Sequence, residues 1–225
     1  MWRSHRGFKI AVDVLVKIYV NGSLVEEVVA SPEELEDLAM GFAYVSGYGA
    51  TSKILIKEGN VYIYAGEGGL PAKVVDCGPA SGAVERVRPG LSISLDDVKR
   101  LAGEFVKLTM PSVEPQLAMH TSAIYYEGDW VVVHDVSRHS GVLKLVGKAL
   151  RLGLDPSKAI AFTTGRASGD MVQRLAKLGV PIVVSLRGPL YSGIDAACRA
   201  GVLLIANVRG VGFTPLCRED LLNHQ

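Results

Sequence analysis

The sequence has little cysteine, almost no net charge and no long apolar run. A formal charge of +1 over 225 residues argues against a protein coated in nucleic acid, so any positive site must be local. No apolar run approaches the length of a membrane span, and residues 1–10 lack the apolar core of a signal peptide. With 48% hydrophobic residues, the chain is expected to be a globular cytoplasmic protein with one large domain or two small ones.

The three cysteines are too widely spaced to indicate a disulfide framework or a zinc site, which fits a reducing compartment. Cys77 is followed by glycine, proline and serine residues typical of an exposed loop. A thiol there can act as a nucleophile or carry sulfur as a persulfide, although a small apolar residue ending a strand is an equal alternative. We expect Cys198 to lie in a helix core and Cys217 to be an incidental thiol.

The N-terminal half is predicted to form hairpins and two helices. Asn21-Gly22 separates two β-branched runs, which is the strongest short hairpin signal, and a second hairpin is predicted around Glu58-Gly59-Asn60. Ser31-Pro32-Glu33-Glu34 is typical of a capping box that begins one helix, and Ser94 caps another that runs to about Leu108.

The C-terminal half alternates strands and helices. A hairpin across Glu127-Gly128-Asp129 is expected first. The further predicted strands are 159–163, 181–185 and 202–206, and the predicted helices are 142–150, 168–178 and 191–199. This spacing predicts a layered α/β domain, a mostly parallel sheet with helices on both faces. Prolines near 110–116 indicate a boundary between a smaller N-terminal α+β domain, residues 1–110, and this domain, residues 117–225.

The stretch that begins at His134 predicts an anion site. The apolar run 130–133 leads into a polar turn, and a helical pattern follows it. Unpaired backbone N–H groups and the positive end of the helix dipole would then lie beside Ser137, Arg138 and His139. Lys144 lies on the following helix and either points back to the same site or is solvated. Asp135 is expected to cap the turn, and we expect no metal at this place.

Four successive predicted strands each end near an arginine. Ligands of open α/β sheets bind at this edge, and the arginine fork suits phosphate. The alternative is that each arginine is merely solvated. No Walker loop and no Gly-x-Gly-x-x-Gly follows a strand, so ordinary ATPase and dinucleotide dehydrogenase functions are disfavoured. The candidate anion-binding residues are Ser137, Arg138, His139, Lys144, Thr164, Gly165, Arg166, Ser168, Arg187, Gly188 and Arg209.

Several of these segments together resemble the formate dehydrogenase accessory sulfurtransferase (FdhD) family. His134 to Gly147 is similar to that family's Glu-Asp-Val-Gly-Arg-His-Asn-Ala-x-Asp-Lys-x-x-Gly signature. The other matching segments, in the family's order, are 20–22, 31–42, the glycine-flanked Cys77, 119–123, 164–168 and 185–189.

The resemblance implies a domain like that of cytidine deaminase without its zinc, joined to a smaller N-terminal domain. It also implies that Cys77 accepts sulfur from a cysteine desulfurase. The sulfur is delivered to a molybdenum or tungsten pterin guanine dinucleotide (molybdopterin guanine dinucleotide) before its insertion into formate dehydrogenase or a related enzyme. A homodimer is also implied. The net charge and the lack of a long apolar run, in turn, lead us to expect neither nucleic acid nor membrane as a partner. The arginines at the strand ends would hold the dinucleotide phosphates.

The chain departs from the family pattern at its loop cysteine. The family has Cys-Gly-x-Cys-Gly, whereas Ala80 or Ser81 stands here in place of the second cysteine, so no disulfide can form within the loop. His134, Ser137, Ser140 and Leu143 also depart from the signature. Whether the chain acts as an enzyme is therefore left open. The alternatives to a sulfurtransferase are a non-catalytic chaperone that binds a pterin dinucleotide or guanine nucleotide, and an enzyme acting on a phosphorylated metabolite.

Overall fold

The computed structural model describes residues 2–48, 51–66, 86–109 and 118–223. Its strands are β1 Trp2–His5, β2 Phe8–Ala11, β3 Val14–Val20, β4 Ser23–Ala30, β5 Thr51–Lys57, β6 Asn60–Ala65, β7 His120–Tyr126, β8 Asp129–Asp135, β9 Ile160–Thr163, β10 Ile182–Ser185, β11 Leu203–Val208 and β12 Gly212–Cys217. Its α-helices are α1 Leu35–Val45, α2 Leu95–Leu108, α4 Arg138–Leu152, α5 Gly169–Leu178 and α6 Tyr191–Ala200, with 3₁₀ turns at Pro156–Lys158 and Glu219–Leu221.

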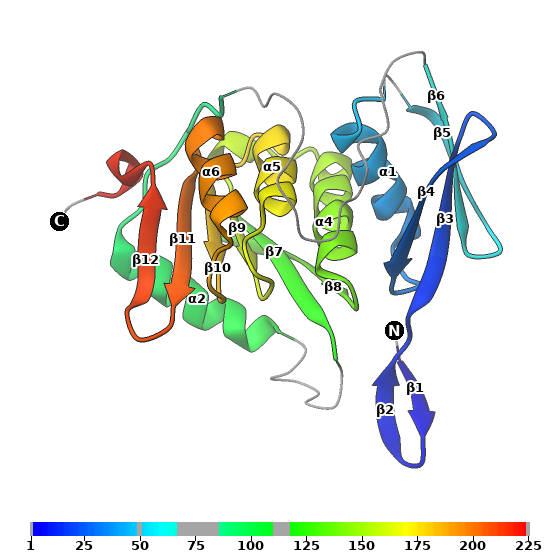
Figure 1. Ribbon diagram of the computed structural model, residues 1–225, viewed down its shortest axis with the longest axis horizontal. Coiled ribbons are helices and arrows are strands. Elements are labelled where there is room, and N and C mark those ends of the chain that lie inside the picture. Colours follow the sequence, from blue (N-terminus) through cyan, green and yellow to red (C-terminus); the bar gives the residue numbers. More distant parts are fainter. Residues whose placement is uncertain (1, 49–50, 67–85, 110–117, 224–225) are drawn as a thin grey trace.

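A six-stranded sheet with the order β12-β11-β10-β9-β7-β8 forms the larger layer (Figure 1). The helix α2 lies across one face, and α4, α5 and α6 lie on the other. Residues of the central strands alternate between these faces because side chains of a strand point to opposite sides: Ile160 and Phe162 pack toward α2, whereas Ala161 packs toward the other helices. The expected α/β layering with helices on both faces is therefore present.

The expectation of a mostly parallel sheet was wrong, because the sheet is mixed. Only β9, β10 and β11 pair in parallel, while β7 runs antiparallel to both β8 and β9, and β12 runs antiparallel to β11. The hairpin β7–β8 places its first strand between its second strand and β9. Even so, β8, β9, β10 and β11 all point in one direction, so their carboxyl ends share one edge.

A four-stranded sheet with the order β4-β3-β6-β5 contains both hairpins predicted for the N-terminal half. It packs on α1, which in turn packs on α4 through two glycines. A Cβ atom at Gly41 would overlap the carbonyl oxygen of Leu143, and one at Gly147 would overlap that of Asp37. These glycines therefore allow the two helix backbones to approach closely. A separate hairpin, β1–β2, precedes the sheet and was not predicted.

The predicted domain boundary falls on residues outside the described ranges. The helix α2, on the N-terminal side of that boundary, packs on the six-stranded sheet, and the core under α1 is continuous with the core under α4 and α5. A division into domains 1–110 and 117–225 stays a prediction, as does the likeness to the cytidine deaminase layering. In the described part of the chain, no helix is long and apolar enough to cross a membrane.

The ends of two helices test the capping predictions. Ser94 caps α2 as expected, since its side chain accepts a hydrogen bond from the Asp97 backbone N–H at 3.0 Å. The capping box expected at residues 31–34 does not form: α1 begins at Leu35 after Glu34, which has a left-handed backbone and makes no side-chain cap. The Ser31 hydroxyl instead accepts a hydrogen bond from the Val136 backbone N–H at 3.1 Å, and the Ser31 backbone N–H donates to Asp135 Oδ2 at 3.1 Å.

Candidate functional site

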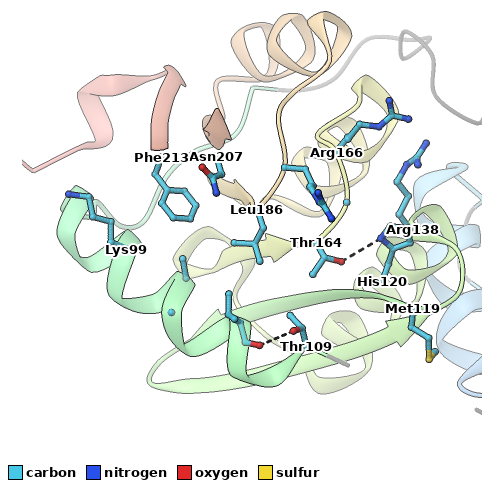
Figure 2. A pocket seen from close by; sticks show the side chains of 15 residues that line it. Lys99, Thr109, Met119, His120, Arg138, Thr164, Arg166, Leu186, Asn207 and Phe213 are labelled. Carbon is cyan, nitrogen blue, oxygen red and sulfur yellow. Dashed lines mark hydrogen bonds between the residues drawn. The ribbon is translucent and has the colours of Figure 1, made fainter. Parts of the chain in front are cut away.

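A cavity of about 860 Å³ lies where the carboxyl ends of β9 and β10 meet the start of β7 (Figure 2). One wall is helix α2, and the opposite side is made by the loops that follow β8, β9 and β10. Its lining residues are Lys99, Ala102, Gly103, Val106, Thr109, Met119, His120, Arg138, Thr164, Gly165, Arg166, Leu186, Arg187, Asn207 and Phe213.

Three of the four arginines expected at this edge line the cavity. Arg138 is the first residue of α4, Arg166 lies in the loop between β9 and α5, and Arg187 follows β10. The fourth, Arg209, is exposed in the turn between β11 and β12 and is not a lining residue. Strand β11 continues to Val208 because it pairs with β12, so Asn207 takes the position that was expected for an arginine.

The loop after β9 is fixed by hydrogen bonds on both sides. Thr163 Oγ1 accepts from the Gly165 backbone N–H at 3.0 Å, and the Ser185 hydroxyl donates to the Gly165 carbonyl at 2.7 Å. On the side of β7, the Thr121 backbone N–H donates to Thr164 Oγ1 at 3.0 Å. A Cβ atom at Gly165 would lie 3.2 Å from Arg138 Cβ and Cδ, so glycine lets this loop approach the start of α4 closely.

The carboxylate of Asp135 holds the turn between β8 and α4, as expected. It accepts hydrogen bonds from the backbone N–H groups of Ser137 at 2.8 Å and Ser31 at 3.1 Å, and from Lys144 Nζ at 2.5 Å. Burial raises the pKa of Asp135, and the charge of Lys144 opposes that rise. Ser137 caps α4 through a 3.4 Å bond from the Ser140 backbone N–H. Neither Ser137 nor Lys144 lines the cavity, and Lys144 is fully buried.

His139 and Ser168 lie in a second buried network, behind the cavity. His139 Nδ1 donates to Asp170 Oδ2 at 2.5 Å, the Ser168 hydroxyl donates to Asp170 Oδ1 at 2.6 Å, and Arg174 donates to the His139 carbonyl at 3.1 Å. Although burial alone raises the pKa of Asp170, the bond from His139 and the charge of Arg174 lower it overall. This network joins the first turn of α4, which carries Arg138, to the first turn of α5, which follows Arg166.

Sequence reasoning missed the wall formed by α2 and the histidine at the start of β7. His120 Nδ1 lies 3.5 Å from Thr164 Oγ1. Burial lowers the pKa of His120, and the charges of Arg138, Arg187 and His139 lower it further. The segment 119–123 was noted for its family resemblance, but no local signal places His120 at the cavity, because its position follows from the antiparallel insertion of β7 between β8 and β9.

Two of the three cysteines are paired with each other. Cys198 of α6 and Cys217 of β12 form a disulfide, with their Cα atoms 5.4 Å apart. This corrects the expectation that both are separate thiols, an error that followed from missing β12, and it removes cysteine spacing as an argument for a reducing compartment. Pro215 hid that strand, since proline in a strand is typical of an edge position. Cys77 lies outside the described residues.

Gly188 and His134 are not among the residues that line the cavity. Gly188 follows Arg187 but is not a lining residue. His134 of β8 has its Nδ1 atom 3.0 Å from the Thr121 hydroxyl oxygen. Among the residues that the structure describes, no three His, Cys, Asp or Glu side chains are grouped so that they could hold a metal ion.

Comparisons with known proteins place the chain in a family. Residues 73–220, more than half of the chain, match the family model described as the FdhD/NarQ family. The chain belongs to the FdhD/NarQ family. A relative named sulfur carrier protein FdhD, from Methanothermobacter thermautotrophicus, is 30% identical over 224 residues, which cover 91% of this chain and 88% of that protein. The resemblance inferred from the sequence motifs is thus confirmed.

Two further matches extend over nearly the whole chain. A protein of the same name from Geobacillus kaustophilus is 24% identical and covers 94% of this chain and 89% of its own length. The crystal structure of a putative formate dehydrogenase accessory protein from Desulfotalea psychrophila superposes with a TM-score of 0.78, covering 96% of this chain and 91% of its own, at 22% identity. This last likeness shows that the fold is shared.

Proposed function

We propose that this chain is a sulfur carrier in formate dehydrogenase maturation, and that its cavity binds a molybdenum or tungsten pterin guanine dinucleotide. The observation that carries this proposal is the composition of the cavity. Arg138, Arg166 and Arg187 line it together with the apolar residues Leu186, Phe213, Ala102 and Val106, and Figure 2 shows Arg138 and Arg166 at the opposite end from Phe213. The names of the relatives in the FdhD/NarQ family support the sulfur-carrier role.

The lining residues fit a dinucleotide of this kind. Guanidinium forks bind phosphate oxygens through paired, charge-assisted hydrogen bonds. An aromatic ring and aliphatic side chains offer a surface on which a flat heterocycle packs. The volume of about 860 Å³ lies in the range of small-molecule sites. When bound, the cofactor supplies the metal centre that receives sulfur, and the residues of this chain bind and orient it.

Cys77 is the proposed sulfur-bearing residue. Its thiolate would attack the terminal sulfur of a cysteine desulfurase persulfide, so that a new S–S bond forms on Cys77 and the desulfurase thiolate leaves. One thiol is sufficient for this exchange. The absence of a second loop cysteine, with Ala80 or Ser81 in its place, favours a second candidate function, a chaperone that binds the cofactor without carrying sulfur.

A pair of measurements tests the binding and carrying roles separately. Calorimetric titration should show that GDP binds more tightly than ADP and that Arg166→Ala weakens GDP binding. Equal affinity for both nucleotides would contradict a guanine dinucleotide site and favour another phosphorylated ligand. After incubation with a cysteine desulfurase and cysteine, mass spectrometry should detect one added sulfur atom that is absent from Cys77→Ala. Nucleotide binding without sulfur uptake would identify the chaperone.

The protein would also act together with other proteins of the sulfur-transfer route. Its partners would be a cysteine desulfurase and formate dehydrogenase or a related molybdenum or tungsten enzyme, in the cytoplasm, with the chain acting as a homodimer. Sedimentation of the purified full-length chain tests the dimer: a single monomeric species at micromolar concentration would contradict it.

A further inference from the structure

His120 differs from every other residue that lines the cavity. Within the described part of the chain, it is the one lining residue whose ordinary pKa lies near neutrality. It is half-buried at the first position of β7, and Figure 2 shows its side chain meeting Thr164 across the dashed contact, on the same side of the cavity as Arg138. A titratable group therefore lies on the cavity surface, next to the arginines.

The charges that face His120 are almost all positive. Arg138 and His139 of α4 and Arg187 after β10 all act on it, and Arg166 and Lys99 line the same cavity. The described lining residues include no aspartate or glutamate. Asp135 is opposite His120 on β8, but its carboxylate is engaged by Lys144 and two backbone N–H groups.

We propose that His120 is a ligand-binding residue of this cavity and that it takes up a proton when a phosphate-bearing ligand binds. The inference rests on the proposed anion-binding role of the cavity and extends it to a residue and to a pH dependence. The imidazolium form of His120 would donate a hydrogen bond to a phosphate oxygen, beside those from the arginines.

The reason is a reversal of the local charge. In the absence of an anion, burial and the neighbouring cations hold the pKa of His120 below its ordinary value, so the ring is neutral at pH 7. A phosphate group brings up to two negative charges to the same place, and an opposite charge within a few ångströms favours the protonated ring. Binding and protonation are then linked. The affinity falls as the pH rises between the two pKa values of His120, by at most about tenfold per pH unit.

Proton uptake is measured directly by calorimetry of the full-length protein in buffers with different ionisation enthalpies. GDP and pyrophosphate are titrated between pH 7 and 8 into the wild-type protein and into His120→Gln, so that protons exchanged by the phosphate groups themselves cancel in the difference between the two proteins. We expect greater uptake for the wild-type protein than for His120→Gln, with an affinity for pyrophosphate roughly tenfold lower in that variant. His134→Gln is the matched control, since this half-buried histidine on β8 also has a lowered pKa but does not line the cavity.

The outcomes separate this inference from the proposed function. Binding of GDP with equal proton uptake in wild-type protein and His120→Gln would overturn the role of His120 and leave the nucleotide site intact. Binding of pyrophosphate with His120-dependent uptake, but without preference for GDP over ADP, would retain the role of His120 and contradict the guanine dinucleotide. Failure of both probes to bind the wild-type protein would overturn both. Circular dichroism and thermal unfolding of each variant show whether it is folded.

Discussion

One short stretch of the chain, His134 to Lys144, contains two kinds of ionisable residue. Asp135, His139 and Lys144 are buried and engaged with other parts of the protein, whereas Arg138 lies among them in sequence but lines the cavity. The direction of each side chain decides its use. The inward residues fix the turn and the helix start, and the outward arginine is held at the edge where ligands of α/β proteins bind.

A charged residue in a predicted binding motif can therefore have a structural role, as Asp135 and Lys144 do, without binding the ligand. The pair formed by Asp135 and Lys144 also reaches Ser31, since Lys144 Nζ donates to the Ser31 carbonyl at 2.8 Å. It therefore joins the N-terminal segment to the turn before α4. The arginines of the cavity instead come from the start of α4 and from two separate loops, and their common feature is the edge of the sheet. Substitutions should distinguish the two groups by their effects on stability and on binding.

The largest effect is expected from the buried pair. Lys144→Met leaves the Asp135 carboxylate buried without its counter-charge, so the free energy of unfolding should fall by about 3–5 kcal/mol. Denaturation by urea measures this change. The double variant Asp135→Asn, Lys144→Met removes both charges and should recover part of the loss. A Lys144→Met protein as stable as the wild type, with weakened GDP binding, would place Lys144 with the ligand-binding residues after all.

The disulfide ties α6 to the edge strand β12, which carries the cavity residue Phe213. Replacing both Cys198 and Cys217 by serine should lower stability by about 3 kcal/mol, because the bond closes a loop with a sequence separation of 19. Unfolding in guanidinium chloride, with and without reductant, measures the loss. The reductant should affect only the wild-type protein. GDP affinity should remain within about twofold at temperatures where the variant is folded; a larger loss would make this edge part of the binding site.

The sequence predicts individual elements well where the signals are local. The Asn21-Gly22 turn, the cap at Ser94 and the alternating strands after residue 120 are all confirmed. Local signals cannot give the order of strands in a sheet. The insertion of β7 between β8 and β9 is a long-range pairing, and both the mixed sheet and the position of His120 depend on it.

The sequence predicts only part of the candidate site, because local signals show neither how strands pair nor which way a side chain faces. Arg138, Arg166 and Arg187 were found because they follow strands that run in one direction, whatever the strand order is. Lys144 was assigned to the cavity because helical spacing does not reveal which way a side chain faces. Arg209 was assigned because the length of β11 depends on its pairing with β12, an edge strand disguised by Pro215.

Arg166 and Arg209 test which arginines bind the ligand. Arg166→Ala should weaken GDP binding by roughly ten- to hundredfold, the loss of one or two charge-assisted hydrogen bonds, and change stability by less than about 0.5 kcal/mol. Arg209→Ala is the matched control, and it should alter neither quantity because this exposed residue lies in the turn beyond β11. Calorimetry and urea denaturation give the two numbers. Equal losses of affinity in both variants would indicate general attraction between charges in place of a defined site.

The smallest effect is a pH dependence that separates two histidines of neighbouring strands. Burial lowers the pKa of both His120 and His134. The unfolded chain therefore binds more protons just below pH 6.5, and stability falls as the pH decreases through that window, by at most about 1.4 kcal/mol per pH unit for each histidine. Well above pH 6.5 neither histidine contributes to the pH dependence of stability, because both are neutral in the folded and in the unfolded chain. His120→Gln and His134→Gln should each reduce this slope by a similar amount in the absence of ligand.

At saturating GDP, His120→Gln and His134→Gln should no longer change the slope of stability against pH by similar amounts. If the ligand raises the pKa of His120, the contribution of this residue to the slope disappears or reverses in the complex. His134 contacts Thr121 and does not line the cavity, so its contribution should persist. Thermal unfolding of the three proteins between pH 5.5 and 7.5, with and without GDP, compares them directly. A slope that GDP changes equally in both variants would mean that the ligand acts on the whole sheet edge through general charge and not through His120.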